Sequence, residues 1–372
     1  MYKKKVVIIG NSASPHVLNR LTRFAAEDDF FFLLFDTNFD SDSEIPIQRI
    51  SRKIPEFLNL PRIRPIIILS WTLFRLKIAK PEIIFIMYCS KLSLLYSIFF
   101  RGKVILSFWG SDILSRPGVR KNLIINYIQK RAILKAARIY CVSKEQVEKV
   151  FEIVGDKLSI NPILLMYGLD LKLYDSIGGN NPDKDEYCNI YSPRWCLPLY
   201  NIEIIIDAVI LLLKQGKKVR LVYRDVDFNR SEDSQIYSTK LAEKIKKSGF
   251  NFNFRAVGLL GLTEQIRLLQ SSDIVISVSH FDGTPLSILE AMACKKVVVC
   301  GKILSTTNII NHELNGYLVN KENSSEIADR IILILENADP QKRVQENARL
   351  FVEHNANIDV EVRQYINSFQ EV

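Results

Sequence analysis

The sequence predicts an α/β protein of two doubly wound, Rossmann-like domains. Short β-branched runs alternate with helical patterns along most of the chain, which is typical of parallel sheets with crossover helices. The chain has 372 residues and 48% of them are hydrophobic, which is enough for two packed cores. A polar stretch with Gly, Asn and Pro at residues 175–187 lies between the two sets of elements and predicts a linker.

The first domain is expected to span residues 1–174. Its strands are predicted at "KVVIIGN", "FFFLLFD", "IIFIMY", "KVILSFWG" and "RIYCVS". One helix is expected over about residues 15–27. Another follows Ser143, which is a good N-terminal cap, and ends at Gly155.

The longest apolar stretch runs from Ile83 to Phe100 and is interrupted by Lys91. A membrane-spanning helix needs about 20 apolar residues, so a buried strand followed by a helix is favoured over membrane insertion. The opening "MYKKKVVIIGN" is basic and then apolar, but its apolar run is too short for a signal peptide.

The second domain is expected over residues 188–354. "CNIYSPR", "KVRLVYRD", "DIVISVS" and "KKVVVC" predict strands, "NIEIIIDAVILLLKQG" predicts a helix, and residues 324–372 have helical patterns. The final helix, about residues 355–372, is expected to pack back on the first domain. A ligand is expected in the cleft between the domains, at the carboxyl ends of the strands.

Cysteine and histidine form no metal pattern. The six cysteines are scattered without a short paired spacing, which indicates a reducing compartment and neither a disulfide framework nor a zinc site. The four histidines are not at ligand spacing, so no structural metal is expected.

Positive charge is concentrated in residues 51–135, which contain 16 Lys or Arg against three acidic residues. This positive charge could serve to bind nucleic acid, an anionic membrane surface or a phosphorylated acceptor. The alternative is a solvent-exposed face whose charge only keeps the protein in solution. Aromatic and apolar residues are interleaved with the basic ones, which favours a membrane surface. No helix-turn-helix, RNA-recognition or zinc-finger pattern supports nucleic acid.

The stretch "HFDGTPLSILEAMAC" follows a predicted strand and predicts a helix with an anion site at its start. Thr284 is a good N-terminal cap and Pro285 suits the first helical position. The first free backbone N–H groups would come from Leu286 and Ser287, and Gly283 lets a ligand approach the backbone. A helix N-terminus favours anions such as phosphate.

Two carboxylates flank this helix start. Asp282 precedes it in the loop, and Glu290 lies about a turn and a half into the helix. With an anion between them, they fit hydroxyl acceptors, one for a ribose and one for a sugar, better than a general acid and base. The alternative is that Asp282 only favours the helix dipole and Glu290 is a surface acid.

The segment "DGTPLSILEAMA" resembles the signature of glycosyltransferase family 4, the retaining enzymes of the GT-B fold. "SPRWCLPLYNIEIIIDAV" is similar to the opening of that family's donor domain, and "CGKILSTTNIINHELNGYLVNKENSSEIADRI" to its closing segment. "VVIIGNSASPHVLNR", "ARIYCVSKEQVEKV" and "MYGLDLKLYD" resemble segments of its first domain. The resemblance implies two domains facing a central cleft and a nucleotide diphosphate sugar donor, without a divalent metal or another cofactor.

The resemblance also implies roles for individual residues. Glu290 would contact the ribose and Asp282, as a catalytic residue, the donor sugar. Arg194 and the backbone at residues 283–286 would face the diphosphate.

This chain departs from the family pattern at three positions. The lysine that usually accompanies the arginine on the diphosphate is missing near Tyr200 and Asn201. Arg224 could compensate, or it could be a surface arginine after a strand. The first acid is Asp282 rather than Glu, and Lys295 stands where a Gly usually ends the helix. A positive φ at Lys295 would cost roughly 1 kcal/mol.

The segment "IGNSASPH" follows the first strand and lacks the G-x-G-x-x-G fingerprint of nicotinamide dehydrogenases. The resemblance suggests that Gly10 and Asn11 contact the donor phosphate or the acceptor. His16 is either an ordinary helix residue or an acceptor-binding residue.

The segment "SFWGSDIL" ends another predicted strand, and relatives carry a similar Gly-Ser-Asp here. Asp112 could orient an acceptor hydroxyl or the donor sugar as a catalytic residue, or it could cap the next helix. Trp109 and Ser111 are candidate acceptor-binding residues.

The expected function is a retaining glycosyltransferase that moves a sugar to a lipid-linked or cell-surface polysaccharide acceptor, as in lipopolysaccharide or capsule synthesis. A cytoplasmic location, peripheral on the inner face of the cell membrane, goes with the basic first half. The alternatives are a non-catalytic nucleotide-sugar-binding relative and a nucleotide-sugar epimerase on the same fold. A phosphorylase is disfavoured because it needs a much longer chain or a lysine-bound cofactor.

Overall fold

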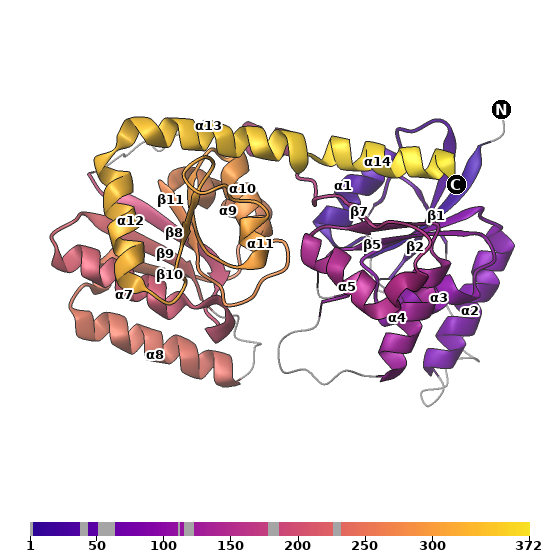
Figure 1. Ribbon diagram of the computed structural model, residues 1–372, viewed down its shortest axis with the longest axis horizontal. Helices are drawn as coiled ribbons and strands as arrows, with labels where there is room; N and C mark the ends of the chain where they lie inside the picture. The colour runs from indigo at the N-terminus through magenta and orange to yellow at the C-terminus, as the bar shows by residue number, and fades with distance from the viewer. Residues whose placement is uncertain are drawn as a thin grey trace. The chain divides into compact units, whose positions relative to one another are not determined.

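The computed structural model describes residues 3–37, 44–50, 64–110, 112–114, 123–177, 186–225 and 232–372. The chain divides into two compact units (Figure 1). Unit 1 comprises Met1–Gly168 and Ile358–Val372, and unit 2 comprises Leu169–Asn357. Each unit has one parallel sheet with helices on both faces, so the predicted fold class is confirmed. Of the expected linker, residues 178–185 lie outside the described residues.

Unit 1 has a parallel sheet in the order β3-β2-β1-β4-β5-β6-β7. Its strands are β1 (Lys4–Gly10), β2 (Phe30–Asp36), β3 (Gln48–Arg49), β4 (Ile83–Met87), β5 (Lys103–Phe108), β6 (Arg138–Cys141) and β7 (Ile163–Leu164). The five expected strands are all present. The two-residue edge strands β3 and β7 are too short to produce a recognisable sequence pattern. The strand order reverses between β1 and β4, which makes the carboxyl ends of these strands the switch point of the sheet.

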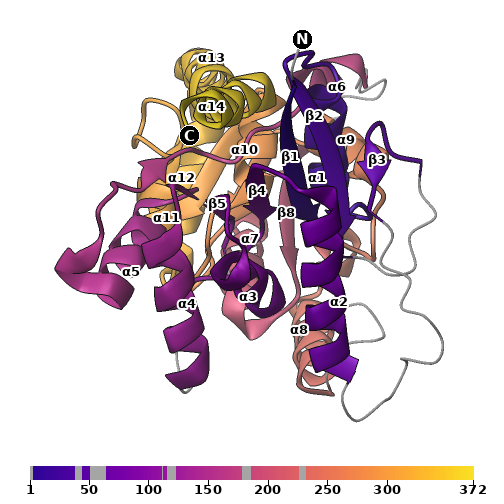
Figure 2. The ribbon, with the colours of Figure 1, turned by 90° about the vertical axis from the view of Figure 1, so that its right-hand side faces the viewer.

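The helices of unit 1 cover both faces of this sheet (Figure 2). They are α1 (Pro15–Phe24), α2 (Arg64–Ala79), α3 (Lys91–Phe99), α4 (Leu123–Lys135), α5 (Lys144–Val154) and α14 (Ile358–Glu371). Helices α2 to α5 share one hydrophobic core with the sheet, and α1 and α14 share the other. Helix α5 has the expected ends, because the Ser143 hydroxyl accepts from the Gln146 N–H and Gly155 has a φ of 63°.

The apolar stretch from Ile83 to Phe100 forms strand β4 and then helix α3, as predicted. Ser90 caps α3 by accepting a hydrogen bond from the Ser93 N–H at 3.2 Å. Among the described residues, none of the helices has both the length and the apolar character needed to cross a membrane.

A buried ion pair joins α14 to α1 within unit 1. The Arg20 guanidinium donates to both carboxylate oxygens of Glu361, and both side chains are almost fully buried. Tyr365 and Phe369 of α14 pack on Phe85, with ring centroids 4.6 and 5.4 Å apart. These contacts make the last helix part of the core of unit 1, although it follows unit 2 in the sequence.

Unit 2 has a parallel sheet in the order β10-β9-β8-β11-β12-β13. Its strands are β8 (Cys188–Trp195), β9 (Val219–Arg224), β10 (Phe254–Val257), β11 (Ile274–Ser277), β12 (Val297–Gly301) and β13 (Tyr317–Val319). The short strands β10 and β13 are additions to the expected set. The strand order reverses between β8 and β11, so their carboxyl ends form the switch point where ligands bind in such sheets.

The helices of unit 2 are α6 (Leu171–Ser176), α7 (Ile202–Lys214), α8 (Glu232–Ser248), α9 (Leu262–Ser271), α10 (Leu286–Ala293), α11 (Leu304–Thr307), α12 (Ser324–Glu336) and α13 (Ala338–Asn355). Short 3₁₀ turns occur in unit 2 at Pro198–Tyr200 and Asn251–Asn253, and in unit 1 at Gly155–Lys157. Helices α7, α8 and α12 pack into one hydrophobic core with the sheet. Helix α9 precedes β11 in the chain and helix α10 follows it. Helix α10 contacts both β11 and β12.

The turn after α10 keeps a left-handed residue without a glycine. Lys295 has a φ of 55°, and its N–H donates to the Met292 carbonyl at 3.0 Å. The helix therefore ends with a left-handed residue, as it would with a glycine at this position. The Cβ of Lys295 must be accommodated in a backbone conformation that favours glycine.

Replacing Lys295 by Gly should raise the free energy of unfolding of unit 2 by up to about 1 kcal/mol, because the relief of strain at Cβ exceeds the stability lost when glycine adds entropy to the unfolded chain. Urea denaturation measures this change. Lys295→Ala is the matched control: it keeps Cβ and should bring no gain. Equal effects of the two substitutions would contradict this account of the turn.

Candidate functional site

Arg194 and Asp282 meet at the switch point of the unit 2 sheet. Arg194 lies near the end of β8, and Asp282 lies in the loop between β11 and α10. Their side chains form an ion pair and are both largely buried. The Arg194 guanidinium also lies over the Tyr200 ring, 4.7 Å from its centroid. The structure thus brings the predicted diphosphate and sugar residues into direct contact.

Glu290 is a buried carboxylate on α10, with 5% of its surface exposed. It accepts hydrogen bonds from the Tyr174 hydroxyl at 3.1 Å and from the Gln265 amide at 2.6 Å. Burial raises the pKa of Glu290, while these two hydrogen bonds and the positive charges of Arg194 and Arg224 act in the opposite direction. The alternative reading of Glu290 as a surface acid is wrong.

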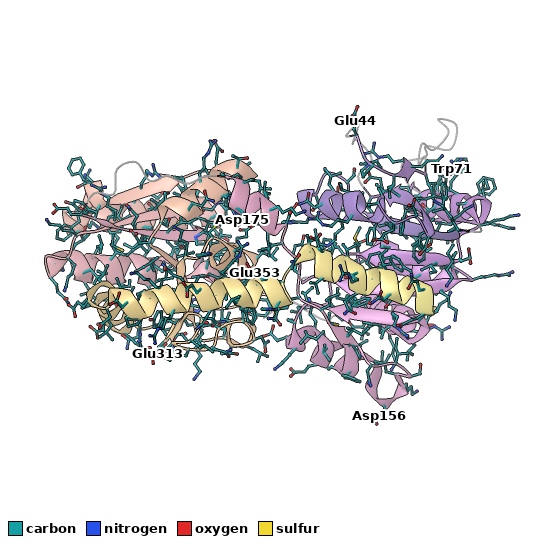
Figure 3. The ribbon with its side chains drawn as sticks, turned by 90° about the horizontal axis from the view of Figure 1, so that it is seen from above. Glu44, Trp71, Asp156, Asp175, Glu313 and Glu353 are labelled. Atoms are coloured by element: carbon teal, nitrogen blue, oxygen red, sulfur yellow. The ribbon has the colours of Figure 1, made fainter. Side chains whose placement is uncertain are left out.

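Helix α6 carries Tyr174 and is itself anchored within unit 2. Arg349 of α13 donates to both carboxylate oxygens of Asp175 at 2.9 Å and to Glu353 at 2.6 Å. Figure 3 labels both acids of this cluster. The arginine fixes the helix from which Tyr174 reaches Glu290.

The start of α10 differs from the prediction by one residue. The helix begins at Leu286, and Pro285 precedes it with a non-helical ψ of 79°. The Leu286 N–H donates to the Thr284 carbonyl at 2.9 Å, so it is not one of the free donors expected there. The Ser287 hydroxyl in the first turn is buried, and in the described part of the chain it has no hydrogen-bond partner. Gly283 lies in the loop before this turn.

Arg224 ends strand β9 with only 8% of its surface exposed. Its guanidinium lies 3.9 Å from the centroid of the Trp195 ring. The reading of Arg224 as a surface arginine is therefore wrong. The region where a lysine was expected is occupied by Tyr200, under Arg194, and by Asn201, which donates to the Lys321 carbonyl at 2.6 Å.

Gly10 and Asn11 form the turn after β1 in unit 1. A Cβ on Gly10 would lie 3.1 Å from Val17 and 3.3 Å from Met87, so a larger residue there would require these side chains to shift slightly. The Asn11 side chain accepts a hydrogen bond from the Ala13 N–H at 3.0 Å. These contacts show how the turn is built and leave its ligand role a prediction.

His16 and Trp109 both pack against Tyr167 in unit 1. The His16 and Trp109 rings each meet the Tyr167 ring edge-on, at 5.1 Å between centroids. Arg20 lies over both larger rings, 5.0 Å from Trp109 and 4.1 Å from Tyr167. Two residues predicted separately as acceptor-binding thus belong to one aromatic cluster around a buried arginine.

Asp112 holds the loop after β5 together. Its carboxylate accepts from the N–H groups of Cys89 and Gly110 at 2.8 Å and of Trp109 at 3.1 Å. Burial raises the pKa of Asp112, and these backbone hydrogen bonds oppose that shift. This set of contacts assigns Asp112 a structural part in the loop, and its catalytic part stays a prediction. Ser111 lies outside the described residues.

Sequence reasoning missed five side chains that complete these clusters. They are Arg20 and Tyr167 in unit 1, and Tyr174, Trp195 and Gln265 in unit 2. Trp195 directly follows Arg194 and could have been noticed. The other four have no local signal, because each reaches its partner from a different segment of the chain.

Comparison with known proteins gives this geometry a context. Residues 179–351 match the family model described as glycosyl transferases group 1. The match covers somewhat less than half of the chain and lies within unit 2. Arg194, Arg224, Asp282 and Glu290 all lie inside it.

Two of the curated relatives are glycosyltransferases by name. An uncharacterized glycosyltransferase of Methanocaldococcus jannaschii is 28% identical over 249 residues, which cover 65% of this chain and 60% of the relative. The N,N'-diacetylbacillosaminyl-diphospho-undecaprenol alpha-1,3-N-acetylgalactosaminyltransferase of Campylobacter jejuni is 32% identical over 97 residues, 26% of each chain. The chain spans less than two thirds of the length of both relatives.

Solved structures of similar fold cover the whole chain. Anabaena HepE in complex with UDP has a TM-score of 0.77 and 16% identity, covering 99% of this chain and 100% of that one. A glycosyltransferase from Rickettsia africae has a TM-score of 0.77 and 16% identity, covering 100% and 99%. At this identity the likeness shows the fold alone, and it confirms the GT-B fold class.

Unit 1 is expected to lose stability as the pH falls from 7 to 5. Burial, together with the positive charge of Arg20, lowers the pKa of His16 from 6.5 to about 4. Between these values the unfolded chain binds a proton that the folded chain does not, so stability is full above pH 6.5 and falls toward pH 4. Linkage gives a loss of about 2 kcal/mol at pH 5, measurable by urea denaturation. His16→Gln should make the free energy of unfolding of unit 1 less dependent on pH. If its pH dependence matched that of the wild type, His16 would not be the group responsible.

Proposed function

We propose that the protein is a retaining glycosyltransferase of family 4 that transfers a sugar from a nucleotide diphosphate sugar to a hydroxyl of a lipid-linked or cell-surface polysaccharide acceptor. The observation that carries the proposal is the buried Glu290 beside the Arg194–Asp282 pair, inside the segment that matches the glycosyl transferases group 1 model. Buried carboxylates held by neutral donors suit hydroxyl recognition, and a guanidinium suits a phosphate.

Each group then has a distinct part in donor binding. Glu290 accepts hydrogen bonds from the ribose hydroxyls, and Asp282 contacts the sugar. Arg194 and the start of α10 stabilise the negative charge that develops on the leaving diphosphate. The leaving phosphate accepts the proton of the acceptor hydroxyl, so we assign no protein nucleophile, metal or cofactor.

Names of the similar proteins support this substrate class. The Campylobacter relative is named as a transferase acting on a diphospho-undecaprenol acceptor, and the Anabaena neighbour was solved with UDP. A lipid-linked acceptor would also suit a protein working at the inner face of the cell membrane, in polysaccharide synthesis such as that of lipopolysaccharide or capsule.

A non-catalytic nucleotide-sugar-binding protein is the second candidate. The aromatic Tyr200 near the expected lysine position favours it, because leaving-group stabilisation depends on preorganised positive charge. Incubation with a panel of sugar nucleotides distinguishes the candidates. Transfer or donor hydrolysis supports the enzyme, binding without turnover supports the second candidate, and sugar conversion without an acceptor would indicate an epimerase.

Glu290→Ala should weaken binding of the nucleotide about 10- to 100-fold, because a charge-assisted hydrogen bond contributes about 1.5–3 kcal/mol. Glu290→Gln keeps the shape and should weaken binding by a similar factor if the charge is what the ribose hydroxyls require. Calorimetry with the nucleoside diphosphate measures both. If both variants bound the nucleoside diphosphate as tightly as the wild type, Glu290 would not be the residue that binds the ribose hydroxyls.

We also propose that unit 1 docks on an anionic membrane through a basic and apolar face made by α2, α3 and α4. These helices lie side by side in unit 1 (Figure 2), and none of the three contains an acidic residue. Phe74, Phe99 and Tyr127 expose large rings there, and Leu123 is 82% exposed. Exposed apolar side chains without acidic neighbours suit insertion between anionic headgroups.

Leu123→Ser together with Tyr127→Ser should reduce partition onto vesicles containing phosphatidylglycerol at least about fivefold, since roughly 1 kcal/mol of apolar burial is lost. Vesicle cosedimentation gives the partition coefficient. Phe252→Ser in unit 2 is a matched control, because Phe252 is 94% exposed and lies outside this face. Equal partition coefficients for the wild type, the double variant and Phe252→Ser would overturn the docking proposal.

A further inference from the structure

Arg224 sits one strand away from the arginine already assigned to the donor. Strands β8 and β9 are parallel neighbours, and Trp195 is paired with Arg224 in their register. Arg194 immediately precedes Trp195. Two arginines therefore reach the carboxyl ends of adjacent strands in unit 2, beside the switch point of the sheet.

The Arg224 side chain is fixed by stacking. Its guanidinium lies 3.9 Å from the Trp195 centroid, a cation–π contact that occupies one face of the planar group. Such stacking holds the plane of the guanidinium in one orientation, with its N–H groups directed from the edge of that plane. The edge lies near the candidate site, because Nη1 is 3.5 Å from the Gln265 side-chain oxygen. The amide of Gln265 in turn donates to Glu290 at 2.6 Å.

The two arginines are close enough to influence each other. Burial lowers the pKa of Arg194, the neighbouring Tyr200 and Glu290 raise it, and the positive charge of Arg224 lowers it further. Arg194 is already paired with Asp282, and an anion with two or more charges would bring oxygen acceptors for both guanidinium groups at once. A diphosphate has the charge and the oxygen acceptors that two guanidinium edges match.

Two buried hydroxyl groups of unit 2 have no hydrogen-bond partner in the part of the chain that the structure describes. The Tyr191 hydroxyl is fully buried, and it lies within the electrostatic reach of Arg224 and Glu290. The Ser287 hydroxyl is buried in the first turn of α10. Buried hydroxyls without partners are costly, which points to a polar ligand as their missing partner.

We propose that Arg224 binds the diphosphate of the donor together with Arg194, supplying the second positive charge for which this chain has no lysine near Tyr200. The inference rests on the proposed function, since it names a further residue for the same site. Its competitor is a purely positioning role, in which Arg224 only orients Gln265 and, through it, Glu290.

A comparison of two ligands separates these roles. Affinity of the full chain is measured by calorimetry for UDP, GDP, ADP, CDP and dTDP, and the tightest of them is kept. The matching nucleoside, which lacks the phosphates, is titrated at millimolar concentration by saturation-transfer NMR. We expect Arg224→Ala to weaken the diphosphate at least tenfold and the nucleoside less than threefold. Arg224→Lys should recover part of the loss by restoring the charge.

Arg220→Ala is the matched control. Arg220 lies on the same strand and stacks on Tyr187 at 4.0 Å, the same kind of contact as that of Arg224 on Trp195. It should leave both affinities unchanged. Gln265→Ala should weaken the nucleoside and the diphosphate by the same factor, because it acts only on the ribose side.

Each outcome has a definite meaning. Equal loss of nucleoside and diphosphate affinity in Arg224→Ala would show a positioning role and overturn the inference, as would no loss at all. A wild-type chain that binds none of the five diphosphates would overturn the proposed function, and the inference with it. Binding by the wild type with an unaffected Arg224→Ala would remove the inference alone.

Discussion

Glu290 is a carboxylate that unit 2 removes from water, and much of the candidate site is arranged to satisfy it. Burying such a group without partners costs several kcal/mol. Tyr174 and Gln265 donate to its two oxygens, and Arg194 and Arg224 place positive charge nearby. One buried acid on α10 thereby fixes the orientation of side chains from α6, α9 and the ends of β8 and β9. A ligand that binds Glu290 meets a site whose polar groups are already oriented.

Unit 1 also buries a charged side chain that must be compensated, but there the buried charge is positive. Arg20 is buried and charged, and Glu361 compensates it from α14. The remaining faces of the guanidinium are covered by Trp109 and Tyr167, and its edge reaches the Gly168 carbonyl at 3.3 Å. Trp109, which is predicted to contact the acceptor, is thus held in place by a buried charge pair. Loss of either partner would disturb Trp109 by leaving an uncompensated buried charge.

The sequence alone predicts the parts of this protein that depend on local patterns. The strands are found because β-branched runs are local, and the motif from Asp282 to Glu290 is found because its spacing is local. Tyr174 and Gln265 lie 116 and 25 residues from Glu290, and no short pattern encodes such contacts. The burial of Arg224 likewise depends on a tryptophan of the neighbouring strand. The start of α10 is one residue late because Pro285 adopts a ψ that a helix does not allow.

The distance along the chain between Arg20 and Glu361 has a consequence for synthesis. The two residues are 341 positions apart, with the whole of unit 2 between them. At typical elongation rates the ribosome needs roughly 20 to 70 s to add that length. During this interval the nascent first unit carries a charged arginine without Glu361 and an apolar sheet face that α1 covers only in part. Unit 2, which is continuous in sequence, can complete its core first, so unit 1 is the later of the two to complete its core.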